Sequence, residues 1–85
     1  MRPPILIVDD DPDIRESLTD MLGHEGYLVH SAASGTDALQ QAKQTRYDAA
    51  LLDIQLPDLN GLSVLKVLME LDASLPVIIL TGNVT

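Results

Sequence analysis

The sequence predicts an open α/β fold with a parallel sheet, and two observations carry that prediction. Short, continuous apolar runs alternate with amphipathic stretches along the chain, which is typical of βαβ units. The apolar runs do not alternate with polar residues, as expected for strands that are covered on both faces. The strands are expected at residues 5–9, 27–31, 49–53 and 77–81. With right-handed crossovers, this order gives a doubly wound sheet.

A first helix is expected between the first two strands. Its apolar face follows the spacing i, i+4, i+7 and i+8 and consists of Ile14, Leu18, Met21 and Leu22. Asp11 is placed to cap this helix, and Pro12 suits the first helical position. Gly23 or Gly26 is expected to end it.

Two more helices are expected in the remaining connections. Ser34 can cap the second helix, and the negative charge of Asp37 interacts favourably with the positive amino end of the helix dipole. A third helix is expected over residues 62–71, with Pro76 closing the connection to the last strand. The inward positions are Ala38, Leu39 and Ala42 in the second helix, and Val64, Leu65 and Leu68 in the third.

Composition narrows the class of protein. A chain of 85 residues forms one small domain. Its net charge of −8 works against binding to a phosphate backbone, so we expect no direct nucleic-acid partner. The absence of cysteine and the presence of only two histidines exclude a thiolate metal site and a nitrogen-ligated zinc, so any metal would be a hard, oxygen-bound cation. No apolar segment is long enough for a secretory signal or a membrane span, so we expect a cytoplasmic protein without membrane contact.

The residues at the ends of the expected strands indicate the chemistry. Asp9 and Asp10 follow the first strand, Asp53 closes the third, and Thr81 and Gly82 close the fourth. Ligands of open α/β sheets bind at this edge. Neighbouring carboxylates repel one another, and a bound Mg²⁺ relieves that repulsion. An aspartate beside such a metal can accept a phosphoryl group while a hydroxyl such as that of Thr81 contacts its oxygens.

The other aspartates are expected to be solvated turn residues or helix caps: Asp11, Asp13, Asp37, Asp48 and Asp58. His24 suits the carboxyl end of a helix, and His30 lies in or near a strand. Neither histidine is expected to take part in the chemistry.

In combination, these residues resemble the receiver domains of two-component response regulators, which have a flavodoxin-like sheet. The resemblance rests on Asp9-Asp10 after an apolar strand, on Ile79-Leu80-Thr81-Gly82, and on Asp53 followed by Pro57 four residues on and Gly61 eight residues on.

The resemblance implies a role for each site residue. Asp53 is the phosphoacceptor, which receives its group from a phosphohistidine of a partner histidine kinase or phosphotransfer protein. Mg²⁺ or Mn²⁺ is bound by Asp10, Asp53 and the backbone carbonyl of Gln55, and by Asp9 through a water. Thr81 contacts the attached group and switches the conformation. The chain is then a phosphorelay signalling domain and not an enzyme, beyond self-catalysed aspartyl phosphorylation and dephosphorylation.

The same resemblance implies a final helix, strand and helix that the 85 residues do not include, with a phosphoryl-binding lysine on that strand. Lys43 and Lys66 lie in expected helices and are expected to be solvated. One alternative is therefore a receiver-fold interaction module that does not carry out phosphotransfer. With the fourth strand exposed and one sheet face uncovered, we expect either a marginally stable monomer or a species that self-associates through these surfaces.

A second alternative is a haloacid-dehalogenase-like phosphatase with Asp9 as nucleophile. Asp11 and Thr81-Gly82-Asn83 fit that pattern. Pro12 stands where that family prefers Thr or Val, and the pattern leaves Asp53 unexplained.

Overall fold

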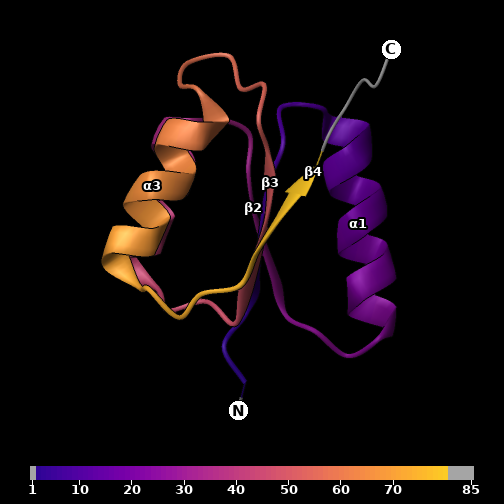
Figure 1. Cartoon of the computed structure of the whole chain (residues 1–85). Coiled ribbons are helices and arrows are strands. Elements are labelled where there is room, and N and C mark those ends of the chain that lie inside the picture. Colours follow the sequence, from indigo (N-terminus) through magenta and orange to yellow (C-terminus); the bar gives the residue numbers. More distant parts are fainter. Residues whose placement is uncertain (1, 81–85) are drawn as a thin grey trace.

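Seven elements alternate along the chain in the computed structural model, which describes residues 2–80. They are β1 (Ile5–Val8), α1 (Pro12–His24), β2 (Val29–Ala32), α2 (Gly35–Gln44), β3 (Ala49–Asp53), α3 (Gly61–Leu71) and β4 (Val77–Leu80). Figure 1 shows the sheet between two helical layers, with α1 on one side and α3 on the other. The expected α/β architecture is confirmed.

The sheet is wholly parallel, and its strands lie in the order β2-β1-β3-β4. The chain therefore moves from β1 to one neighbour, β2, and returns past β1 to the other neighbour, β3. The winding direction reverses between β1 and β3. In doubly wound sheets, the carboxyl ends of the strands at such a reversal form the ligand-binding crevice.

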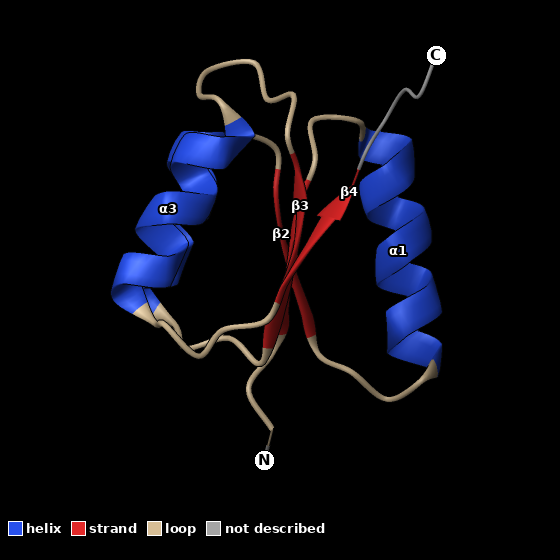
Figure 2. Cartoon of the chain, viewed as in Figure 1, coloured by secondary structure: helices blue, strands red, loops and turns tan. Residues whose placement is uncertain are grey.

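The main core lies between the sheet and the layer of α2 and α3. The two central strands contribute Leu6, Val8, Ala50 and Leu52, and the two helices contribute Ala38, Val64 and Leu68. The inward positions expected for these helices are confirmed, with Leu39, Ala42 and Leu65 packed against the same core. Figure 2 shows the strands as a single layer beside these helices.

Helix α1 begins as expected, because the Asp11 side chain caps it and Pro12 occupies its first turn. It ends at His24, and Gly26 follows with a φ of +89°, a conformation that favours glycine. Two of its expected inward positions are wrong, since Ile14 is 39% exposed and Met21 is 60% exposed. Leu18 and Leu22 are partly buried, so the side of the helix that carries them faces the sheet. Ile14 and Met21 lie at the margin of that side.

The second strand was expected to start at residue 27, but it starts at Val29. The Tyr27 N–H donates to the Leu22 carbonyl at 3.1 Å, and Gly26 donates to Gly23 at 3.0 Å. These bonds keep the backbone tied to the end of α1 for two further residues. The fourth strand is described through Leu80, so the expected end at Thr81 lies outside the described residues.

Helices α2 and α3 both begin with a capping side chain. The Ser34 hydroxyl accepts a hydrogen bond from the Asp37 N–H at 3.2 Å, as expected. Helix α3 starts one residue earlier than expected, because Asn60 caps it by accepting from the Leu62 N–H at 2.9 Å. Within residues 2–80, no helix is long and apolar enough to cross a membrane.

Gly61 closes the loop between β3 and α3. Its N–H donates to the Ile54 carbonyl at 2.8 Å. A Cβ at this position would lie 2.4 Å from the Ile54 Cα and 2.5 Å from the Asp53 carbonyl oxygen. Because these are backbone atoms, a side chain at position 61 requires the end of β3 to move.

We therefore predict that Gly61→Ala lowers the free energy of unfolding by about 1–3 kcal/mol, because the added methyl overpacks against backbone. Gly23→Ala is the matched control, since Gly23 is helical and has nothing within 4 Å of a built Cβ. That control should gain about 0.5–1 kcal/mol from helix propensity. Urea denaturation measures both, and a neutral Gly61→Ala would contradict the close approach.

Candidate functional site

The pairing of β1 with β3 brings the sequence-predicted carboxylates together. Val8 lies opposite Leu52, so the next residues, Asp9 and Asp53, lie side by side at the carboxyl edge of the sheet. Asp9 comes two residues after Ile7, and Asp53 two residues after Leu51. Because side chains alternate along a strand, both carboxylates point to the face of the sheet that α1 covers. Asp10 joins them, and one carboxylate oxygen from each of the three residues lies within 4.8 Å of the others.

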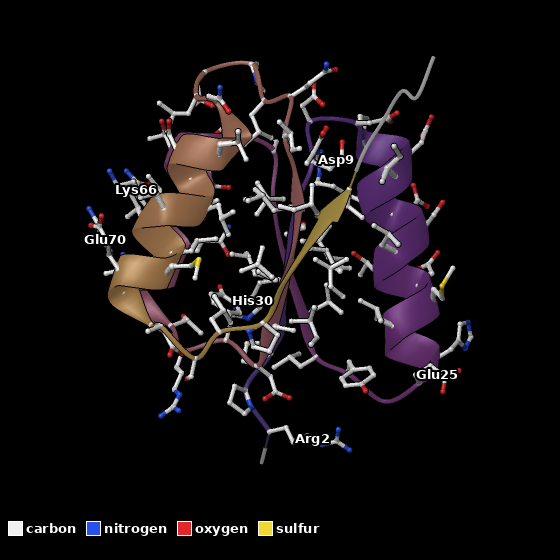
Figure 3. The ribbon with its side chains drawn as sticks, in the orientation of Figure 1. Arg2, Asp9, Glu25, His30, Lys66 and Glu70 are labelled. Carbon is white, nitrogen blue, oxygen red and sulfur yellow. The ribbon has the colours of Figure 1, made fainter. Side chains whose placement is uncertain are left out.

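Two of these carboxylates are nearly inaccessible to solvent. Asp9 is 3% exposed and Asp53 is 8% exposed, whereas Asp10 is exposed. Burial raises the pKa of Asp9, and the neighbouring charge of Asp53 raises it further, against the lowering effect of a hydrogen bond from the Asp11 N–H. That bond is 2.9 Å long. Figure 3 shows Asp9 near the start of α1. The cluster therefore concentrates negative charge where water screens it poorly.

A basic side chain that the sequence analysis did not single out also reaches this edge. Arg15, in the first turns of α1, donates from Nη1 to the Asp9 backbone carbonyl at 2.7 Å. It brings a positive charge from α1 to the backbone of the cluster. The helical periodicity could have indicated it, because Arg15 lies on the side of α1 that faces the sheet.

The loop from β3 to α3 forms the other wall of the site. The Gln55 N–H donates to Asp53 Oδ1 at 3.1 Å, and Gln55 pairs with Asn60 in an isolated antiparallel bridge. Pro57 lies at the exposed tip of this loop, and Gly61 closes it.

Asp58 in this loop reaches a different helix. Its carboxylate accepts from the Gly35 and Thr36 N–H groups of α2, each at 2.9 Å, and from the Thr36 hydroxyl at 2.5 Å. The Thr36 hydroxyl, followed by these two amides, lowers the pKa of Asp58 from 3.8 to about 2. A solvated turn or cap was expected here. The structure specifies a cap on α2, 22 residues earlier in the chain.

The remaining residues of the sequence analysis lie away from the cluster or outside the description. Lys43 and Lys66 are exposed, as expected. His24 lies in the last turn of α1, and His30 in β2 shares a 2.8 Å hydrogen bond with the Tyr47 hydroxyl. Thr81 and Gly82 lie outside the described residues.

Comparison with known proteins identifies the family. The family model described as the response regulator receiver domain matches residues 5–85. This chain belongs to the response regulator receiver domains. It is 43% identical over 81 residues to the transcriptional regulatory protein PrrA of Mycobacterium leprae, an alignment that covers 95% of this chain and 35% of PrrA. The chain thus spans about a third of the length of this curated relative.

Solved receiver domains have the same fold as this chain. A CheY-like receiver domain protein from Methanospirillum hungatei superimposes with a TM-score of 0.95 at 35% identity, covering 100% of this chain and 68% of the other. The response regulator TrrA of Thermotoga maritima, solved in complex with Mg²⁺-BeF, gives a TM-score of 0.90 at 37% identity, covering 98% and 71%. The family match spans Asp53, Pro57 and Gly61, which the phosphatase alternative left unexplained. Receiver domains are signalling domains and not classical enzymes.

The charge gathered by Asp9, Asp10 and Asp53 predicts that Asp9→Asn stabilises the metal-free protein at pH 7. Asparagine keeps an oxygen for the Asp11 N–H and removes a buried charge. Because the pKa of Asp9 is raised on folding, this carboxyl supports the fold below its ordinary pKa and ceases to do so as pH rises through the folded value. The melting temperature should therefore rise by roughly a few degrees at pH 7.

The advantage of Asp9→Asn should shrink as pH falls through the raised pKa of Asp9, where the wild-type carboxyl takes up its proton. Thermal unfolding followed by circular dichroism, with a chelator present, measures the difference. A melting temperature below that of wild type at pH 7 would show that the buried charge does not destabilise the fold.

Proposed function

We propose that this receiver domain accepts a phosphoryl group on Asp53 from a phosphohistidine of a partner histidine kinase or phosphotransfer protein. The observation that supports the proposal is the convergence of Asp9, Asp10 and Asp53 within 4.8 Å at the crevice of the sheet. Asp53 is the member of this cluster that also carries the Pro57 and Gly61 spacing of the family.

The donor set fits a small, hard cation. All three side chains offer carboxylate oxygens, which suit Mg²⁺ or Mn²⁺, and two of them are buried without a full countercharge. We propose that Asp10, Asp53 and the Gln55 backbone carbonyl ligate the ion and that Asp9 acts through a bound water. When bound, the cation neutralises charge on the incoming phosphoryl oxygens. The structure of TrrA of T. maritima contains Mg²⁺-BeF, which supports Mg²⁺ as the cation.

The chemistry proposed for Asp53 is an in-line displacement at phosphorus. One carboxylate oxygen forms a bond to phosphorus while the P–N bond of the donor phosphohistidine breaks, and the donor imidazole keeps the electron pair. The product is an acyl phosphate on Asp53. The short loop held by Gly61 limits the movement of this side chain. We propose that Thr81 donates a hydrogen bond to the new oxygens and that Gly82 leaves space beside it, so that the switch begins at the end of β4.

The output of the switch belongs to the same proposal. PrrA of M. leprae is named a transcriptional regulatory protein and is longer than this chain. We propose that this domain serves a regulator of that kind, within the cytoplasm, and that nucleic-acid contact belongs to a separate region.

A second candidate, an interaction module that self-associates without phosphotransfer, is favoured by exposed apolar side chains. Ile78 of the edge strand β4 is 56% exposed, and Met21 of α1 is 60% exposed. Both lie on the α1 side of the sheet, where the helical cover is thinner. We propose that copies of the 85-residue chain associate through this surface. Sedimentation velocity should show a dimer or larger species, and a monomer at all concentrations would contradict this proposal.

Phosphotransfer predicts that acetyl phosphate with Mg²⁺ adds the mass of one phosphoryl group to the intact chain and that Asp53→Asn abolishes this gain. The reason is that an amide cannot form the acyl phosphate. Asp48→Asn is the matched control, because Asp48 is an exposed aspartate just before the same strand. Intact-mass spectrometry, with loss of the label in base, provides the readout.

Three outcomes separate the candidates. Label on Asp53 supports the receiver chemistry. Label on Asp9 favours the phosphatase alternative. An unmodified wild type that still binds Mg²⁺ favours the interaction module.

A further inference from the structure

The loop that follows the proposed phosphoacceptor is held by a second element, the amino end of α2. Both oxygens of Asp58 are used in this contact, one by the Gly35 N–H and the other by the N–H and hydroxyl of Thr36. Among the hydrogen bonds of residues 2–80, these three tie the loop to another helix. The first amides of a helix have no partner within it and carry partial positive charge, so a carboxylate is well suited to the position.

Close packing accompanies these hydrogen bonds. A Cβ built on Gly35 would lie 2.8 Å from the Leu59 Cβ and 3.0 Å from the Val64 Cγ2. The residue after Asp58 therefore approaches the α2 backbone at a distance that a larger residue at position 35 would prevent. Leu59 also packs against the main core. The loop tip consequently has one position relative to α2.

The position of the tip determines the position of Gln55. Gln55 pairs with Asn60 across the loop, and its N–H donates to Asp53 Oδ1. Gly61 then returns the chain to Ile54. These bonds close the loop on itself, and none of them involves α2. The Asp58 contact supplies the hydrogen bonds between the loop and α2.

We propose that Asp58 is a positioning residue for the metal and phosphoryl site, because its contact with α2 holds the Gln55 backbone beside Asp53. The inference rests on the proposed function, in which the Gln55 carbonyl is a metal ligand. Asp58 is not one of the three carboxylates that converge at the site. It acts through the loop backbone, as partners outside the ligand shell do in many metal sites.

The test compares Asp58→Ala with Asp72→Ala in the 85-residue chain, with Mg²⁺ alone as the ligand. Asp72 is the matched control, because its carboxylate also accepts from a backbone N–H and a hydroxyl, those of Ser74, and lies at the end of α3. NMR titration of the Gln55 and Asp53 amides should give a dissociation constant for Mg²⁺ about tenfold higher in Asp58→Ala. Asp72→Ala should have the dissociation constant of wild type. The difference in Mg²⁺ affinity between the two variants should remain even if their melting temperatures are equal.

Asp58→Asn provides a graded variant. Asparagine keeps one acceptor oxygen and can still bond one of the α2 amides, so its affinity for Mg²⁺ should fall between those of wild type and Asp58→Ala. If Asp58→Ala does not fold, Asp58→Asn and Asp72→Asn replace the first pair. Equal affinities in the Asp58 and Asp72 variants would overturn the inference.

A measurement without metal separates this inference from the proposed function. Amide hydrogen exchange at Gln55 and Gly61 should be faster in Asp58→Ala than in Asp72→Ala, because the loop then lacks its hydrogen bonds to α2. If wild type binds no Mg²⁺, the proposed function is wrong, and the exchange rates still decide whether Asp58 holds the loop. Unchanged exchange at both amides would overturn the positioning role.

Discussion

The parallel pairing of β1 with β3 determines where the other functional groups of this receiver domain must lie. It aligns Val8 with Leu52, so that Asp9 and Asp53 emerge as neighbours at the point where the winding of the sheet reverses. A shift of one residue in this register would place one of the two carboxylates on the opposite face. The fully buried apolar side chains of the two strands hold the register; they are Leu6, Ile7, Val8, Ala50 and Leu52.

The same pairing places like charges close together, which favours the binding of a cation. Three carboxylate oxygens lie within 4.8 Å of one another, and burial makes their repulsion harder to screen. Asp58 shows the opposite situation a short distance away, where α2 amides and a hydroxyl stabilise the charged form and lower the pKa to about 2. One environment favours a cation or a transferred group, whereas the other fixes backbone.

Much of this arrangement could be predicted from local sequence. The caps at Asp11 and Ser34, the alternation of strands and helices, and the aspartates that end β1 and β3 depend on neighbouring residues or on the rules of parallel sheets. Three features could not. The Asp58 contact with α2 joins residues distant in the chain, and the exposure of Met21 depends on how α1 is rotated. The late start of β2 depends on local hydrogen bonds, such as that from the Tyr27 N–H to the Leu22 carbonyl, which the apolar pattern does not indicate.

The central claim is that the cluster at the β1–β3 edge holds a divalent cation and directs phosphoryl chemistry to Asp53. A crystal structure of the chain with Mg²⁺ and beryllofluoride tests it most directly, because beryllofluoride mimics an attached phosphoryl group without turning over. We expect the beryllium on an Asp53 oxygen and one ion in contact with Asp10, Asp53 and the Gln55 carbonyl. Beryllium on Asp9, or an ion bound away from these carboxylates, would contradict it.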